Sequence, residues 1–119
     1  MPRRSARETE LLRRAKRRVD TLDFYPRPVS LRHVRVVSAP WLFRVPGFRR
    51  FHGYEVGPLI LTRRPLELVH DDLIVHELTH VWQSQHRPVR MWLSYLWQGY
   101  RANEHEIEAR EAVRRTRTI

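Results

Sequence analysis

The segment that most constrains the fold is residues 73–85, LIVHELTHVWQSQ, which is apolar almost all the way round a helical projection. Asp71 and Asp72 precede it, and carboxylates favour a helix N-terminus because they meet free N–H groups and the positive end of the helix dipole. A helix without a broad polar face is buried between layers of a fold. We therefore expect this helix at the centre of the protein, although it carries two histidines and a glutamate that need partners there.

The chain before this helix predicts one helix and two or three strands. In residues 6–22 apolar residues recur at spacings of three and four, which indicates an amphipathic helix with an arginine-rich outer face. Residues 31–37 alternate valines with arginines, a pattern typical of a strand. A second strand region covers residues 51–62, interrupted by Gly57 and Pro58. Because proline cannot donate to a strand ladder, Pro58 predicts an edge strand or a bulge.

Two further helices are expected after the central one. Pro88 begins a predicted helix over residues 89–100, and Asn103 can cap a last helix from Glu104 to about Arg115. The fold class is therefore α+β: an N-terminal helix, a small twisted sheet of two to three strands, the central helix and two C-terminal helices. One apolar stripe on the helix of residues 89–100 is expected in the core; it comprises Trp92, Leu93, Leu96 and Trp97.

Between the two strand regions, residues 38–50 predict a loop with exposed aromatic side chains. These are Trp41, Phe43 and Phe48, next to prolines and arginines. They would either wall a substrate cleft or form a patch that binds a partner protein.

Composition limits the classes of function. The 119 residues predict a single domain over 1–119, with a basic N-terminal helix in residues 1–22 and a basic tail in residues 113–119. The absence of cysteine excludes a disulfide framework, a cysteine zinc site and thiol catalysis. No run approaches the roughly 18 apolar residues of a membrane span. No apolar segment follows the basic N-terminus, so a secretory signal is not predicted and we expect a cytoplasmic protein.

The net charge of +10 is concentrated at the two ends of the chain. Residues 1–18 hold eight basic and two acidic side chains, and residues 110–119 hold four basic and one acidic. Such a field attracts polyanions, so one hypothesis is binding of nucleic acid or an acidic partner. The other is that solvated basic helix ends keep a small protein soluble. The second is favoured because the sequence lacks a zinc finger, an RNP-type aromatic strand or a clear helix-turn-helix.

Residues 76–80 form the motif HExxH on the central helix. Residues four apart lie one turn above each other, so His76 and His80 project from one face towards a common point. Two neutral imidazoles suit Zn²⁺, and Glu77 would lie beside a zinc-bound water and act as its general base. The alternative is that both are helix-face histidines with hydrogen-bond partners within the core, which leaves a buried glutamate unexplained.

A catalytic zinc needs a third protein ligand and one open position. Glu106 and Glu108 point about 200° apart on the last predicted helix, so one of them can face the metal. The other reading of these glutamates is an ordinary acidic first turn. His86 and His105 compete as ligands, and either would give a three-histidine site. The residues by themselves leave these alternatives open.

With these motifs the chain resembles the gluzincin metallopeptidases, in particular their small minimal-scaffold forms. Three segments occur in the same order as in those enzymes: GYEVGPLIL, then HELTHVWQ, then YRANEHEIEA. The resemblance covers roughly residues 31–112. In strings of this kind the glutamate three residues before the alanine is the ligand, which here is Glu106. The resemblance implies one Zn²⁺ held by His76, His80 and Glu106, and hydrolysis of peptide bonds in protein or peptide substrates with Glu77 as base. Many relatives have aspartate after that alanine, supporting a zinc histidine, whereas this chain has Arg110.

Two further roles follow from the resemblance. Tyr100 is the first candidate to stabilise the oxyanion and Tyr95 the second, the alternative for both being a core tyrosine. The strand segment of residues 54–61 would hold an extended substrate at the sheet edge, unless it only covers the core.

Two other functions remain open from the sequence. One is a zinc-bearing interaction module or latent enzyme, because self-blocking is known in the minimal gluzincins. The other is a basic nucleic-acid-associated protein.

Overall fold

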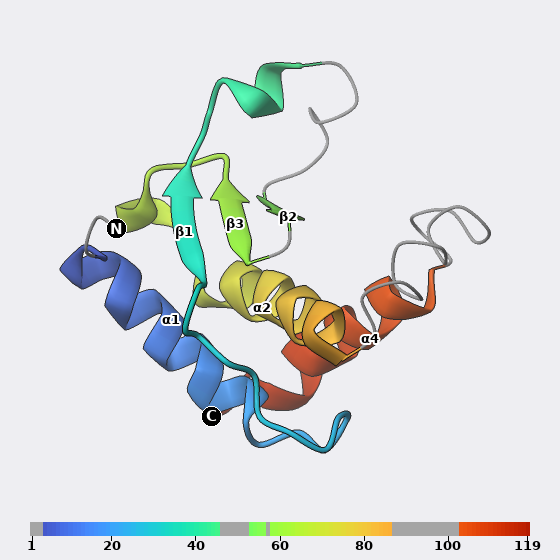
Figure 1. The fold of residues 1–119 in the computed structure, drawn as a ribbon. Coiled ribbons are helices and arrows are strands. Elements are labelled where there is room, and N and C mark those ends of the chain that lie inside the picture. Colours follow the sequence, from blue (N-terminus) through green and yellow to red (C-terminus); the bar gives the residue numbers. More distant parts are fainter. Residues whose placement is uncertain (1–3, 46–52, 57, 87–102) are drawn as a thin grey trace.

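The computed structural model describes residues 4–45, 53–56, 58–86 and 103–119. Three helices, three strands and two short 3₁₀ segments are found there, and they confirm the α+β class. In chain order they are α1 (Ala6–Val19), β1 (Arg35–Ser38), η1 (Leu42–Arg44), β2 (Gly53–Val56), β3 (Leu59–Thr62), η2 (Leu66–Leu68), α2 (Asp71–His86) and α4 (Glu104–Thr116). Figure 1 shows α2 between α1 and α4 and next to the small sheet.

Helix α1 begins and ends where local hydrogen bonds replace those of the helix. The Ser5 hydroxyl accepts a hydrogen bond from the backbone N–H of Glu8 at 3.1 Å, which caps the first turn. At the other end the Thr21 hydroxyl donates to the carbonyl of Arg18 at 2.7 Å. The helix therefore stops at Val19 rather than at residue 22 as predicted, because a side chain competes for the last carbonyls.

The sheet has the order β1-β3-β2, with β1 parallel and β2 antiparallel to β3. Val56 pairs with Leu59, so residues 57–58 join two antiparallel strands. Pro58 therefore lies in a turn and not inside a strand, and β3 is central, which corrects the edge or bulge expected for this proline. The first strand is shorter than predicted, because the N–H of Val34 donates to the carbonyl of Leu31 at 3.1 Å and bends the chain just before β1.

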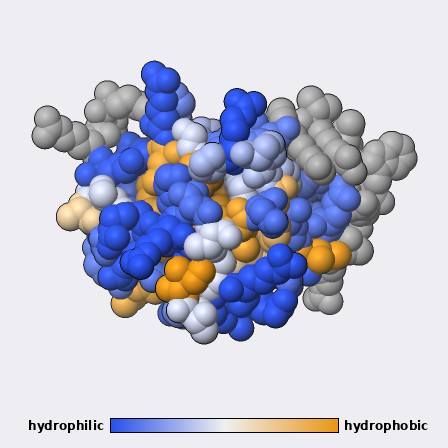
Figure 2. Space-filling view, turned by 90° about the horizontal axis from the view of Figure 1, so that it is seen from below, coloured by the Kyte–Doolittle hydropathy of each residue, from blue (hydrophilic) through white to orange (hydrophobic). Residues whose placement is uncertain are grey.

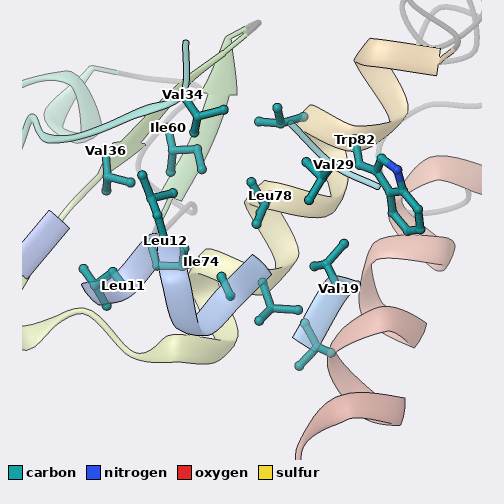
Figure 3. Close-up of a cluster of buried hydrophobic side chains, with 14 of the residues drawn as sticks. Leu11, Leu12, Val19, Val29, Val34, Val36, Ile60, Ile74, Leu78 and Trp82 are labelled. Carbon is teal, nitrogen blue, oxygen red and sulfur yellow. The ribbon is translucent and has the colours of Figure 1, made fainter. Parts of the chain in front are cut away.

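The core lies where α1, α2 and the sheet meet, and it confirms that α2 is buried. Figure 3 shows side chains from all three converging: Leu11, Leu12 and Val19 from α1, Val36 and Ile60 from the sheet, and Ile74, Leu78 and Trp82 from α2. Strand β2 approaches α2 closely at Gly53, where an added Cβ would lie 2.9 Å from Leu73 Cδ1. A larger residue at this position would require the Leu73 side chain to shift.

Two buried charged side chains of α1 connect it to the other elements. The Glu8 carboxylate accepts hydrogen bonds from the Arg35 guanidinium at 2.9 Å and from the Val36 N–H at 2.6 Å, which links α1 to β1. The Arg18 guanidinium donates to Asp72 at 2.8 Å and to the Thr116 hydroxyl at 3.0 Å. Arg18 therefore joins all three described helices at one end of the molecule.

The aromatic residues expected in an exposed loop are not alike. Trp41 is 68% exposed, whereas Phe43 is only 1% exposed, because the 3₁₀ turn of η1 directs its ring inward. The expectation for Phe43 is therefore wrong. Phe48, the helix predicted over residues 89–100 and its apolar stripe lie outside the described residues.

One face of the protein is mainly polar. The face seen from below in Figure 1 carries mostly hydrophilic side chains, with hydrophobic ones between them (Figure 2). Within the described ranges, no helix combines the length and hydrophobicity that crossing a membrane requires.

Candidate metal centre

Two helices position the three side chains of the candidate site. His76 and His80 lie one turn apart on α2, with ring centroids 4.9 Å apart and ring planes at 78°. Glu106 lies in the first turn of α4, which Asn103 caps by accepting a hydrogen bond from the N–H of His105 at 2.7 Å and a long one from the N–H of Glu106 at 3.4 Å. The cap therefore sets where α4 begins and with it the position of Glu106.

The carboxylate of Glu106 lies between the two imidazoles. Its Oε2 is 3.1 Å from Nε2 of His76, and its Oε1 is 2.7 Å from Nε2 of His80. One candidate ligand atom from each residue lies within 4.8 Å of the other two. His80 and Glu106 are buried and His76 is partly exposed, so the site opens to solvent on the His76 side.

The carboxylate of Glu106 and the imidazole of His80 shift each other's pKa values towards the charged forms. Burial by itself would raise the pKa of Glu106, but the adjacent imidazoles of His76 and His80 outweigh it and hold this pKa well below its usual range. Burial would likewise lower the pKa of His80, but the adjacent Glu106 carboxylate outweighs burial, and with the charge of Glu77 raises this pKa to about 9. In the metal-free protein a proton on His80 therefore balances the buried carboxylate.

The donor set fits a metal ion. The Nε2 atom of His80 is buried and has no well-oriented hydrogen-bond partner among the described residues, because its short contact with Glu106 lacks hydrogen-bond geometry. In the neutral ring such an orphaned nitrogen is costly in a folded protein unless a proton or a metal ion takes its lone pair. Two imidazole nitrogens and one carboxylate are the ligand types of a catalytic zinc site, which leaves a fourth position open.

Glu77 is buried beside this group but has a different electrostatic environment from Glu106. Its side chain is only 5% exposed, and burial raises its pKa even though His80 and His76 act in the opposite direction. Two neighbouring carboxyl groups thus have pKa values moved in opposite directions. Such a division is typical of sites in which one carboxylate stays ionised and the other exchanges a proton.

The competing ligands named from the sequence have other partners. Glu108 accepts a hydrogen bond from the Tyr25 hydroxyl at 2.6 Å. His86 stacks on Tyr25, with its Nδ1 atom 3.1 Å from the carbonyl of Trp82. His105 is buried but does not belong to the group of three. Tyr100 and Tyr95 lie outside the described residues.

One residue of the site was missed by the sequence reasoning. Gln83 is fully buried, and its side-chain oxygen is 2.7 Å from Nδ1 of His80. The available signal was its spacing, because a residue three positions after a ligand lies on the same helical face. A polar side chain on an otherwise apolar helix, one turn from a motif residue, indicates a hydrogen-bond partner for that residue.

The positive charge of α1 is partly neutralised within the helix. Arg13 and Arg14 both pair with Glu10, at 2.7 and 2.9 Å, and Lys16 pairs with Asp20 at 2.9 Å. The field that α1 presents to a polyanion is therefore weaker than its count of basic residues suggests. Binding of nucleic acid or an acidic partner stays a prediction.

The fold and the site together define a small α+β protein with a buried His-His-Glu group that could hold a metal ion. Comparison of the chain with protein-family models, with curated proteins and with solved structures found no match to any of them. The motif and the geometry of this site are therefore the evidence for a function.

Proposed function

We propose that the protein is a zinc metallopeptidase that hydrolyses peptide bonds. The observation that carries the proposal is the convergence of His76, His80 and Glu106 from two helices, with their ligand atoms within 4.8 Å of one another. Glu106 is 26 residues from His80 in the sequence, so helix periodicity alone does not explain its position. A bound metal offers one reason for placing all three groups in the interior.

Zinc is the metal that we propose for this donor set. His76 and His80 would hold it through imidazole nitrogens and Glu106 through a carboxylate oxygen, which is a common catalytic combination. When bound, zinc supplies Lewis-acid polarisation of a carbonyl group and lowers the pKa of water at the open position. The partly exposed side of His76 is where a substrate would enter.

Glu77 is the proposed general base and acid. Its carboxylate accepts a proton from the attacking water and then delivers it to the nitrogen of the departing amine. The raised pKa that burial gives Glu77 favours this exchange, because a carboxylate accepts a proton from water more readily when its pKa is raised. Glu106, with its lowered pKa, stays an anion and is suited to be a ligand.

Strand β2 is the proposed site of substrate alignment. It lies at one edge of the described sheet and contacts α2, the helix that carries the motif, whereas β3 is central and has no free edge. An extended peptide could add to the edge of β2 by main-chain hydrogen bonds and run past the site. Residues 59–61 cannot bind substrate in this way, because they belong to β3, which is paired on both sides.

Elemental analysis and a hydrolysis assay test the proposal together. We expect one zinc per chain in the wild type and in Glu77→Gln, and much less in Glu106→Gln. Against a mixture of peptides and unfolded proteins, Glu77→Gln should lose at least 100-fold in rate, within the range typical of a general base. Glu111→Gln is the matched control, because it makes the same change on the exposed face of α4.

The outcomes separate the candidate functions. Wild-type activity in Glu77→Gln would contradict the catalytic assignment. Zinc in the wild type without hydrolysis would indicate a zinc-bearing interaction module or a latent enzyme. No divalent metal in the wild type, after loading attempts with zinc, would contradict the metal centre itself.

A further inference from the structure

The buried amide of Gln83 links the candidate ligand His80 to the helix that carries Glu106. Its oxygen lies 2.7 Å from Nδ1 of His80, and its nitrogen donates to the carbonyl of His105 at 2.9 Å. The same nitrogen lies 3.2 Å from Oε1 of Glu108. Because His105 and Glu108 both belong to α4, one side chain on α2 contacts a metal-site histidine and two groups of the facing helix.

These contacts allow only one orientation of the Gln83 amide. The carbonyl oxygen of His105 and the carboxylate of Glu108 can only accept hydrogen bonds, so the two N–H groups of the amide must face them. The opposite orientation would place the amide oxygen against two acceptors in the protein interior. The amide oxygen is therefore directed at Nδ1 of His80.

The orientation of the amide in turn determines which nitrogen of His80 carries its proton. An oxygen at 2.7 Å requires a donor, so Nδ1 is protonated. In the neutral ring the lone pair is then on Nε2, the buried atom that lacks a well-oriented partner and lies beside Glu106. The hydrogen bond on one nitrogen thereby selects the other nitrogen as the ligand atom.

Glu108 and Tyr25 hold the amide from the far side. Glu108 Oε1 accepts from the Tyr25 hydroxyl at 2.6 Å and from the Gln83 amide. Tyr25 itself is fixed by ring contacts, edge-on to Trp82 at 5.0 Å and stacked on His86 at 5.1 Å. A row of hydrogen bonds therefore runs from Tyr25 through Glu108 and Gln83 to His80.

We propose that Gln83 is a positioning residue that holds His80 as the Nδ1–H tautomer, with Nε2 presented to the metal, and that Glu108 orients the Gln83 amide. The part of this proposal that concerns metal binding rests on the proposed function, whereas the tautomer of His80 is a property of the protein without metal. Glu108, a competitor for the third ligand position when only the sequence is considered, thus acts on His80 through Gln83.

The first test measures the tautomer in the metal-free wild-type protein at alkaline pH, where the imidazole is neutral. Nitrogen-15 spectra of the histidine side chains distinguish a protonated from an unprotonated ring nitrogen, and His80→Gln identifies the signals. We expect Nδ1 of His80 to carry the proton. A proton on Nε2 would overturn the proposal, and this test does not need metal binding.

The second test measures zinc affinity by competition with a chromophoric chelator. Gln83→Leu should bind zinc about 10- to 100-fold more weakly than the wild type, the usual effect of removing a group that orients a metal ligand. Gln85→Leu is the matched control, because it makes the same change on the same helix at an exposed amide that pairs with the backbone of Ser30. Affinity within twofold of the wild type in Gln83→Leu would overturn the proposal.

A charge exchange tests the role of Glu108 and guards against a variant that fails to fold. Gln83→Glu alone places two carboxylates in contact and should weaken zinc binding. Adding Glu108→Gln restores an amide donor opposite the new carboxylate, which can still accept from Nδ1 of His80. We expect the double variant to bind zinc at least tenfold more tightly than Gln83→Glu alone. No recovery would contradict the role of Glu108 in orienting residue 83. A wild type that binds no zinc but shows the Nδ1–H tautomer would contradict the function and support the positioning role.

Discussion

Leu78 separates the structural face of α2 from its chemical face. It lies between His76 and His80 in the sequence, but a residue two positions along a helix points about 200° away. Its side chain is 0% exposed and packs in the core shared by α1, α2 and the sheet (Figure 3). Leu78→Ala should therefore weaken the fold without removing a group from the metal centre.

The expected loss follows from the size of the space left behind. Leucine-to-alanine changes in protein cores cost about 2–5 kcal/mol, and the cost is higher where the surroundings cannot collapse. Leu78 lies in the middle of a 16-residue helix that packs on both neighbours, which resists collapse. We expect about 3 kcal/mol, and for a chain of 119 residues this lowers the melting temperature by about 12 °C.

The assay is urea and thermal unfolding of the metal-free protein, followed by circular dichroism. Leu68→Ala is the matched control, because Leu68 is 64% exposed in η2 and its truncation should change stability by less than about 0.5 kcal/mol. Zinc affinity of folded Leu78→Ala, measured well below its melting temperature, should stay within a few-fold of the wild type. A loss under about 1 kcal/mol would refute the buried position of α2. Abolished zinc binding in the folded variant would refute the separation of the two faces.

Three further predictions concern the buried charges. Because the pKa of His80 is about 9 in the folded metal-free protein against 6.5 in the unfolded chain, its contribution to stability is complete below pH 6.5 and is lost as the pH rises through 9. Urea unfolding at pH 6.5 and 9.5 checks this, and equal or greater stability at 9.5 would contradict it. Glu8→Gln should lower the urea midpoint far more than Glu10→Gln, because Glu8 is buried against β1 whereas Glu10 pairs at the surface; equal effects would show that the Glu8 contacts are unimportant. Arg18→Met should cost about 3 kcal/mol in urea unfolding, because it leaves buried polar groups of α4 without their donor; a change below about 1 kcal/mol would argue against this junction.

Features that depend on neighbours along the chain could be predicted from the sequence. The period of apolar residues located α1, the aspartate pair located the start of α2, and Asn103 located the start of α4. The two histidines of the motif share a face because a helix repeats every 3.6 residues. Each of these inferences uses interactions within about one helical turn, which the local sequence contains completely.

Features that depend on packing between distant segments could not be predicted in the same way. The sequence placed Glu106 and Glu108 on different faces of α4, and the resemblance to gluzincins favoured Glu106 as the ligand. Only the packing of α4 against α2 turns Glu106 towards the histidines and Glu108 towards Tyr25, which is 83 residues away. The burial of Phe43 and the position of Pro58 in a turn also depended on the assembled sheet.

The sequence by itself thus determined the three described helices, the α+β class and the pair of histidines, because short-range periodicity and capping specify them. The tertiary structure decided which carboxylate faces those histidines and which amide supports them. The physical reason is that a buried polar group needs a partner, and the partner comes from whichever segment the core brings within hydrogen-bonding distance.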